Sequence, residues 1–69
     1  MLRIDPPLGA EIVRELARVG AYDDAEAPFG ERARTALVDF MHVENLENRV
    51  RTDGTIDVQT LDYLRAYKR

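Results

Sequence analysis

The chain has 69 residues, of which 45% are apolar and 33% are charged, and its formal net charge is −3. This balance is typical of one folded domain and too apolar for a disordered chain. Cysteine is absent and histidine occurs once, at His42, so disulfides are excluded and a zinc site lacks its usual ligands. A core this small rarely supplies more than roughly 3–5 kcal/mol, so support from a neighbouring domain or a second copy stays open.

The charge pattern and the hydropathy pattern exclude two classes of partner. Acidic and basic residues are interleaved without a basic stripe, so we expect no nucleic-acid partner. No apolar run approaches the ~20 residues that span a bilayer, so we expect no membrane-spanning segment. Residues 1–5 do not begin an export signal, and the compartment stays unknown: cell wall or periplasm would follow only if a parent protein is exported.

The first helix is predicted to begin at Asp5-Pro6-Pro7 and to end at Gly20. Aspartate caps a helix N-terminus well, and proline fits a first turn whose N–H groups lack partners. Apolar residues then recur at spacings of three and four, which predicts one buried stripe. This stripe contains Leu8, Ile12, Leu16 and Val19, joined by Val13 and Ala17.

A connector of about ten residues, 21–30, is predicted to lead into a second helix. This helix is expected to begin at Gly30 or Glu31 and to end at Met41 or His42. Its predicted inner face contains Ala33, Ala36, Leu37, Phe40 and Met41, and its water-facing side contains Arg32, Arg34 and Asp39.

Residues 43–51 are predicted to form a short helical turn or two, and residues 52–55 a tight turn around Asp53-Gly54. The last helix follows Asp57 as its N-cap, with Leu61 and Leu64 inward and Tyr67 at the rim. No segment alternates at period two, so no sheet is expected. The predicted fold is all-α: a small orthogonal bundle of three main helices plus a short additional helical segment.

The residue types predict no enzyme. Serine and cysteine are absent, and no threonine has a histidine base at a suggestive spacing, so we predict no catalytic residue, metal or cofactor. Asp39, His42 and Glu44 are interpreted as the structural end of the second helix, because a metal needs a fuller ligand set. Residues 53–57 resemble half of a calcium loop, but the remaining ligand positions are occupied by arginine and threonine, which favours a plain turn.

Two groups of side chains are candidates for binding. Tyr22 lies in the connector beside Asp23 and Asp24, and its ring can stack on a sugar face while its hydroxyl forms a hydrogen bond. The simpler interpretation is that the ring fills the gap between the first two helices and that the acidic loop is solvated. Tyr63 and Tyr67 stand four apart on the last helix, as a candidate interface or as half-buried packing.

The order of these elements resembles the putative peptidoglycan-binding domains of bacteria. The resemblance begins in residues 18–23, where a helix ends in a glycine–tyrosine turn, and continues in residues 29–40, which carry an alanine–leucine–phenylalanine face. Residues 43–49, 53–57 and 61–64 are similar to the subfamily found as the C-terminal domain of proteins with an N-terminal-nucleophile-hydrolase-like body.

This resemblance covers residues 4–64 and implies a compact helical bundle with a non-catalytic role. It also implies that residues 1–69 are a single domain from the C-terminus of a larger protein, with a parent domain on the N-terminal side and a natural start upstream of Met1. Related domains place a second glycine after the tyrosine–aspartate of the loop, where this chain has Asp24, and this difference weakens a glycan contact inherited at Tyr22.

Two functions follow as alternatives. The first is a module that binds peptidoglycan or its peptide, with Tyr22, Asp23, Asp24 and Arg34 near a groove between the first two helices. The second is an interaction or oligomerisation domain, which docks on its parent domain or on a second copy and uses Tyr63 and Tyr67.

Overall fold

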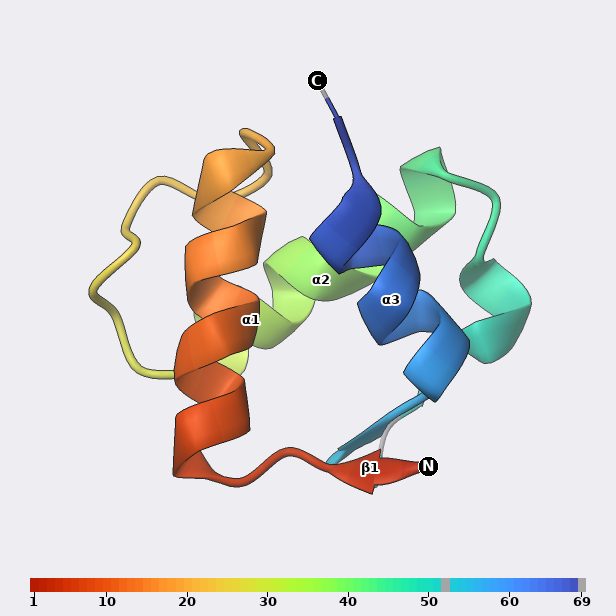
Figure 1. Ribbon diagram of the computed structural model, residues 1–69, viewed down its shortest axis with the longest axis horizontal. Helices are drawn as coiled ribbons and strands as arrows, with labels where there is room; N and C mark the ends of the chain where they lie inside the picture. The colour runs from red at the N-terminus through yellow and green to blue at the C-terminus, as the bar shows by residue number, and fades with distance from the viewer. Residues whose placement is uncertain (52, 69) are drawn as a thin grey trace.

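The computed structural model describes residues 1–51 and 53–68 and is mostly helical. Its three helices are α1 (Pro6–Arg18), α2 (Glu31–Val43) and α3 (Val58–Ala66), with a 3₁₀ turn at Glu47–Arg49. In Figure 1, α2 passes behind both α1 and α3, and the connector from α1 runs back along the outer side of α1. Within the described residues, no helix has the length and apolar character needed to cross a bilayer.

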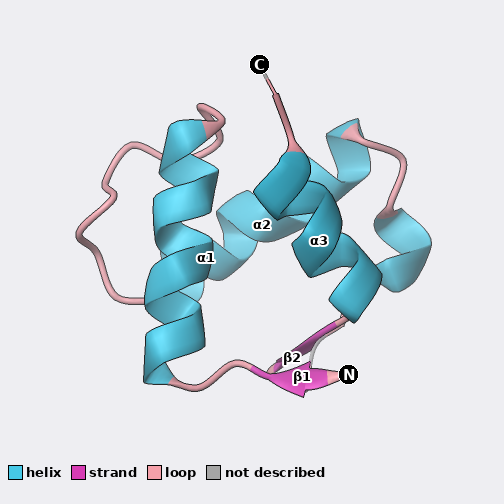
Figure 2. Cartoon of the chain, viewed as in Figure 1, coloured by secondary structure: helices cyan, strands magenta, loops and turns pink. Residues whose placement is uncertain are grey.

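The prediction that the chain contains no sheet is wrong. Strands β1 (Leu2–Arg3) and β2 (Thr55–Ile56) form a small antiparallel sheet, with Leu2 opposite Ile56 and Arg3 opposite Thr55 (Figure 2). The N–H of Ile4 extends the pairing by donating to the Gly54 carbonyl at 2.9 Å. Strands of two residues are too short to show an alternating pattern, so nothing in the local sequence indicated them.

Aspartate caps begin α1 and α3, as the sequence predicted. The Asp5 carboxylate accepts a hydrogen bond from the Leu8 N–H at 3.0 Å, and the Asp57 carboxylate accepts one from the Thr60 N–H at 3.3 Å. Each bond satisfies an N–H that has no partner inside its helix. The caps therefore fix where both helices begin.

Left-handed residues end α1 and α2. Gly20 has a φ of 81°, and the N–H that follows it donates to the Leu16 carbonyl at 2.8 Å. Asn45 has a φ of 61°, and the N–H that follows it donates to the Met41 carbonyl at 2.6 Å. These bonds satisfy carbonyls left over at a helix end and turn the chain sharply. The turn at Gly20 brings the next residues beside α2.

The core is apolar and draws on all three helices and β2. Its buried residues are Ile12, Val13, Leu16, Val19, Ala33, Ala36, Leu37, Phe40, Met41, Ile56, Leu61 and Leu64. The inner faces predicted for the three helices are confirmed, except that Leu8 and Ala17 are only half-buried. Thr60 is also fully buried, and its hydroxyl has no hydrogen-bond partner among the described residues.

Gly9 allows the connector to approach α1 closely. A Cβ at this position would lie 2.8 Å from the Cβ of Phe29, which is closer than side-chain carbons approach. Glycine inside a helix costs roughly 0.5–1 kcal/mol relative to alanine, so its presence here follows from packing and not from helix propensity.

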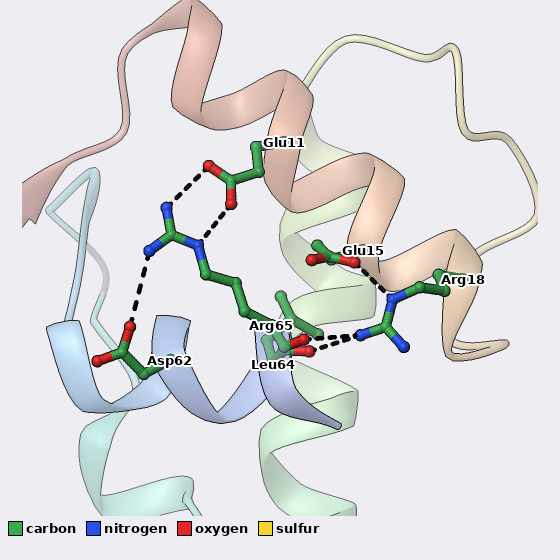
Figure 3. A network of polar contacts seen from close by, with 6 residues as sticks. All are labelled: Glu11, Glu15, Arg18, Asp62, Leu64 and Arg65. Atoms are coloured by element: carbon green, nitrogen blue, oxygen red, sulfur yellow. Dashed lines mark hydrogen bonds and ion pairs between the residues drawn. The ribbon is translucent and has the colours of Figure 1, made fainter. Parts of the chain in front are cut away.

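Arg18, at the end of α1, binds the end of α3 (Figure 3). Its guanidinium donates to the carbonyls of Tyr67 at 2.7 Å and Leu64 at 2.9 Å, and its Nε donates to the Glu15 carboxylate at 2.6 Å. The last carbonyls of a helix lack partners inside the helix and carry the negative end of its dipole. A cation from α1 therefore caps α3.

Arg65 forms the reciprocal link from α3 to α1 (Figure 3). Its Nε and Nη2 bind the two carboxylate oxygens of Glu11 at 2.5 and 2.9 Å, and its Nη1 lies 3.6 Å from Asp62. The hydrogen bond from Arg65 is the main cause that lowers the pKa of Glu11 below its usual 4.5. Two-point contacts of this kind fix the relative orientation of the two groups.

We expect Arg18→Ala to lower the free energy of unfolding by about 1–2 kcal/mol, because α3 loses its cap and the site is partly exposed. Urea unfolding followed by circular dichroism measures the loss. Arg14→Ala is the matched control, since Arg14 is exposed on the same helix and forms no hydrogen bond in the described part of the chain. Equal losses in the two variants would contradict the capping role.

We expect stability to fall as the solution is acidified from about pH 5 to about pH 3. The pKa of Glu11 is lower in the folded state, so its contribution is present above the unfolded value of 4.5 and disappears as the pH falls through the folded value. Glu11→Gln should flatten this part of the profile, measured by urea unfolding at each pH. Glu26→Gln, in the exposed connector, is the control, and identical profiles for both variants would exclude this role of Glu11.

Candidate functional site

An open hollow of about 630 Å³ lies between the turn after α1 and one face of α2. The turn contributes Gly20, Ala21, Tyr22 and Asp23, and α2 contributes Glu31, Arg32, Thr35, Ala36 and Asp39. Positions 32, 35, 36 and 39 are spaced by three and four residues, so they share one face of the helix. The left-handed turn at Gly20 places the opposite wall.

Tyr22, Asp23 and Arg32 form a polar group in this hollow. The Arg32 guanidinium lies over the Tyr22 ring, 5.6 Å from its centroid, and its Nη2 lies 3.4 Å from the Asp23 carboxylate. The side chains of Arg32 and Asp23 are 75% and 80% exposed, so their ion pair adds little to stability. The half-buried ring packs against the core and holds the group in place.

The hollow has an excess of negative charge. Asp23, Glu31 and Asp39 each carry a carboxylate, whereas Arg32 carries the only positive charge among the lining residues. The Thr35 hydroxyl donates to the backbone carbonyl of Glu31 at 3.1 Å. Within the described residues, the carboxylates of Glu31 and Asp39 form no hydrogen bond or ion pair. The hollow therefore offers free acceptors to a ligand.

A second hollow of about 350 Å³ adjoins the first along α2. Both are lined by Gly20, Ala21, Ala36 and Asp39. The second adds Val19, Phe40, Val43, Glu44 and Tyr67. The walls change from charged to mainly apolar between the two hollows.

Of the ligand-binding residues expected from the sequence, Tyr22 and Asp23 line the first hollow and Asp24 and Arg34 do not. Asp24 shapes the connector instead, because its carboxylate accepts a hydrogen bond from the Glu26 N–H at 3.0 Å. Arg34 lines a narrow crevice elsewhere on α2. The arginine in the hollow is Arg32, which was expected only on the water-facing side of the helix. Its spacing to Ala36 and Asp39 places all three on one face of the helix, but the sequence does not show which face borders the turn after α1.

Tyr63 and Tyr67 pack against α2 and share one acceptor. Their rings lie 6.2 and 5.3 Å from the Phe40 ring, measured between centroids. Both hydroxyls donate to the Glu44 carboxylate, at 3.2 Å from Tyr67. The hydrogen bond between the Tyr63 hydroxyl and Glu44 is the main cause that raises the pKa of Tyr63, which is 40% exposed.

Of the other sequence candidates, Asp39 and Glu44 both line the second hollow, where Glu44 accepts hydrogen bonds from the tyrosines. His42 is exposed and lines neither hollow. In residues 1–51 and 53–68, no three acidic or histidine side chains lie close enough to hold a metal ion.

The Asp53 carboxylate serves its own turn. It accepts hydrogen bonds from the Thr55 hydroxyl at 2.5 Å and from Arg51 at 2.7 Å, and Gly54 has a φ of 79°. These contacts confirm the turn interpretation for residues 53–55, whereas Thr52 lies outside the described residues.

Comparison with known proteins gave one match. The model of a family described as "putative peptidoglycan binding domain" matches residues 9–64, which include α2 and most of α1 and α3. No curated protein and no solved structure matched the chain.

We expect Glu44→Gln to lower the pKa of Tyr63 toward its usual value of 10.0, because the carboxylate disfavours the phenolate. Because the pKa of Tyr63 is higher in the folded state than in the unfolded state, its contact with Glu44 stabilises the protein below about pH 10. This contribution is lost as the pH rises through the folded pKa of Tyr63. Ultraviolet absorbance against pH measures the titration, and Tyr63→Phe assigns it. An unchanged Tyr63 titration in Glu44→Gln would contradict the contact.

Proposed function

Because the chain belongs to the family of putative peptidoglycan-binding domains, we propose that it binds cell-wall peptidoglycan in the hollow between α2 and the turn after α1. The observation that carries the proposal is the group of Tyr22, Asp23 and Arg32, which lines this hollow within the matched residues. An aromatic face, a cation and a carboxylate converge there on an open space of about 630 Å³. Ligand sites commonly combine a concave wall with a few convergent polar groups.

The chemistry of the hollow suits the polymer. Peptidoglycan joins sugars that carry acetamido groups to short peptides with amino and carboxylate groups. The Tyr22 ring and hydroxyl suit a sugar or an amide, and the Arg32 guanidinium suits a carboxylate or an amide carbonyl. Gly20 and Ala21 have little or no side chain, so a ligand can approach the backbone of the turn.

The domain in this proposal holds the polymer and does not cleave it. The chain contains no serine or cysteine, and His42 is not among the residues that line either hollow. Nucleophilic catalysis by serine or cysteine and general base catalysis by histidine need these groups within hydrogen-bond reach of the substrate.

We further propose that the domain works at the C-terminus of a protein with an N-terminal-nucleophile-hydrolase-like body. The resemblance of residues 43–49, 53–57 and 61–64 to that subfamily supports this context. A binding module would then keep the parent domain at the wall, which raises its effective concentration there.

A second candidate function is docking on the parent domain or on a second copy. Val43 supports it, because this apolar side chain is 77% exposed beside Phe40 and Tyr67 in the second hollow. Tyr63, 40% exposed and stacked near the same rings, would extend the surface. Exposed apolar patches of this kind mark interaction sites.

Sedimentation with purified peptidoglycan sacculi tests the proposed function. We expect the wild-type domain to pellet with the sacculi, and we expect Tyr22→Leu and Arg32→Ala each to weaken binding by roughly two- to tenfold. Leucine at position 22 keeps the apolar packing and removes the aromatic face, and Tyr22→Phe separates the ring from the hydroxyl. Arg14→Ala is the control, because Arg14 lies on α1 outside the hollow.

Absence of the wild-type domain from the pellet would refute the proposed function. Equal binding by wild type, Tyr22→Leu and Arg32→Ala would refute the placement of the ligand. The same run without sacculi reports self-association, and a dimer that dissociates in Val43→Asp would favour the docking function instead.

A further inference from the structure

The two hollows on α2 form one groove. Gly20, Ala21, Ala36 and Asp39 line both, so the space beside Tyr22 and the space beside Tyr67 meet at these four residues. The four shared residues include a glycine and two alanines, which leave room for an extended chain to lie across them. Asp39 is the only charged residue among the four.

Charge is not balanced along this groove. At one end, Asp23 and Arg32 lie 3.4 Å apart and partly neutralise each other, and the Glu31 carboxylate lines the same end without a hydrogen bond or ion pair among the described residues. The Glu44 carboxylate at the other end accepts from Tyr63 and Tyr67. Asp39 stands between these groups, exposed, and its carboxylate has no hydrogen bond or ion pair in the described part of the chain. A ligand in the groove therefore meets an uncompensated negative charge near its middle.

The position of Asp39 in α2 gives the fold no evident benefit. Aspartate has a weak helix propensity, and negative charge is disfavoured toward the C-terminus of a helix, most strongly in its last turn. Asp39 lies four residues before the end of α2 at Val43, next to that turn. Asp5 and Asp57, by contrast, cap helix N-termini, and Asp62 pairs with Arg65.

We propose that this groove takes the peptide part of peptidoglycan, with a free ammonium group of that peptide seated on the Asp39 carboxylate. The inference rests on the proposed function and specifies which part of the polymer is recognised. N-acetylated sugars are neutral and gain nothing from Asp39. Wall peptides combine small side chains with the free amine of a diamino acid, and these match a groove with a small-residue floor and one central carboxylate.

The ends of the groove fit the same ligand. Arg32 can receive a peptide carboxylate or carbonyl at the Tyr22 end. Val19, Phe40 and Val43 offer apolar contact to methyl groups at the Tyr67 end. A peptide that runs along α2 thus contacts the Arg32 guanidinium first, the Asp39 carboxylate next and the apolar residues at the Tyr67 end last.

Amide NMR titration of the whole chain tests the inference with three soluble probes. The first is a wall tetrapeptide with a free diamino-acid amine, the second is the same peptide with that amine acetylated, and the third is an oligomer of N-acetylglucosamine. We expect the free-amine peptide to shift amides of residues 20–23 and 35–40, and we expect acetylation to weaken binding at least about fivefold. Added salt should weaken the free-amine complex more than the acetylated one.

Asp39→Asn should reproduce the loss caused by acetylation and should leave the melting temperature unchanged or raised, because the variant removes a charge that the helix disfavours. Asp62→Asn is the matched control, since it makes the same change on α3 outside the groove. A purely structural role for Asp39 would lower the melting temperature and affect both peptides alike.

The outcomes separate this inference from the proposed function. Binding of the sugar oligomer or of the acetylated peptide as tightly as the free-amine peptide, with Asp39→Asn unaffected, would overturn the inference and leave peptidoglycan binding intact. Failure of all three probes and of sacculi would overturn both. Failure of the three probes while sacculi still bind would overturn the inference alone.

Discussion

Arg18 joins the C-terminal end of α1 to the C-terminal end of α3, and the arrangement of the helices depends on this contact. Its guanidinium binds the Tyr67 carbonyl and, beside the Tyr67 N–H, the Leu64 carbonyl, at the end of α3 where no further helical turn follows. Arg65 and Glu11 form a second, two-point link between the same helices. In a domain this small, with no disulfide, such links fix an angle that a thin apolar core defines only loosely.

The end of α1 also builds the candidate site. Gly20 adopts a left-handed conformation directly after Arg18 and Val19, so the chain reverses where α1 is held against α3. Tyr22 and Asp23 then face α2 across the first hollow. The site is held by one face of α2 and by a short turn from the anchored end of α1, and a site on such elements is positioned more firmly than one on a long connector.

Two groups of charged side chains differ in how the fold uses them. One group is paired between elements, as in Arg65 with Glu11 or Arg49 with Asp57, and it stabilises the fold. The other group lies in the groove, where Glu31 and Asp39 have no partner within the described residues. Charged side chains that form no contact within the fold are candidates for ligand recognition, because only a bound ligand can replace the water around them with an opposite charge or a hydrogen-bond partner.

The sequence by itself determined the features that act over a few residues. Asp5, Gly20 and Asp57 set helix ends through bonds to near neighbours, and the spacing of apolar residues set the inner faces of the helices. Tertiary structure alone decided the pairing of β1 with β2 and the selection of Arg32 for the hollow. These features join residues distant in the chain, and they exist only once the helices have packed at particular angles, which no local pattern encodes.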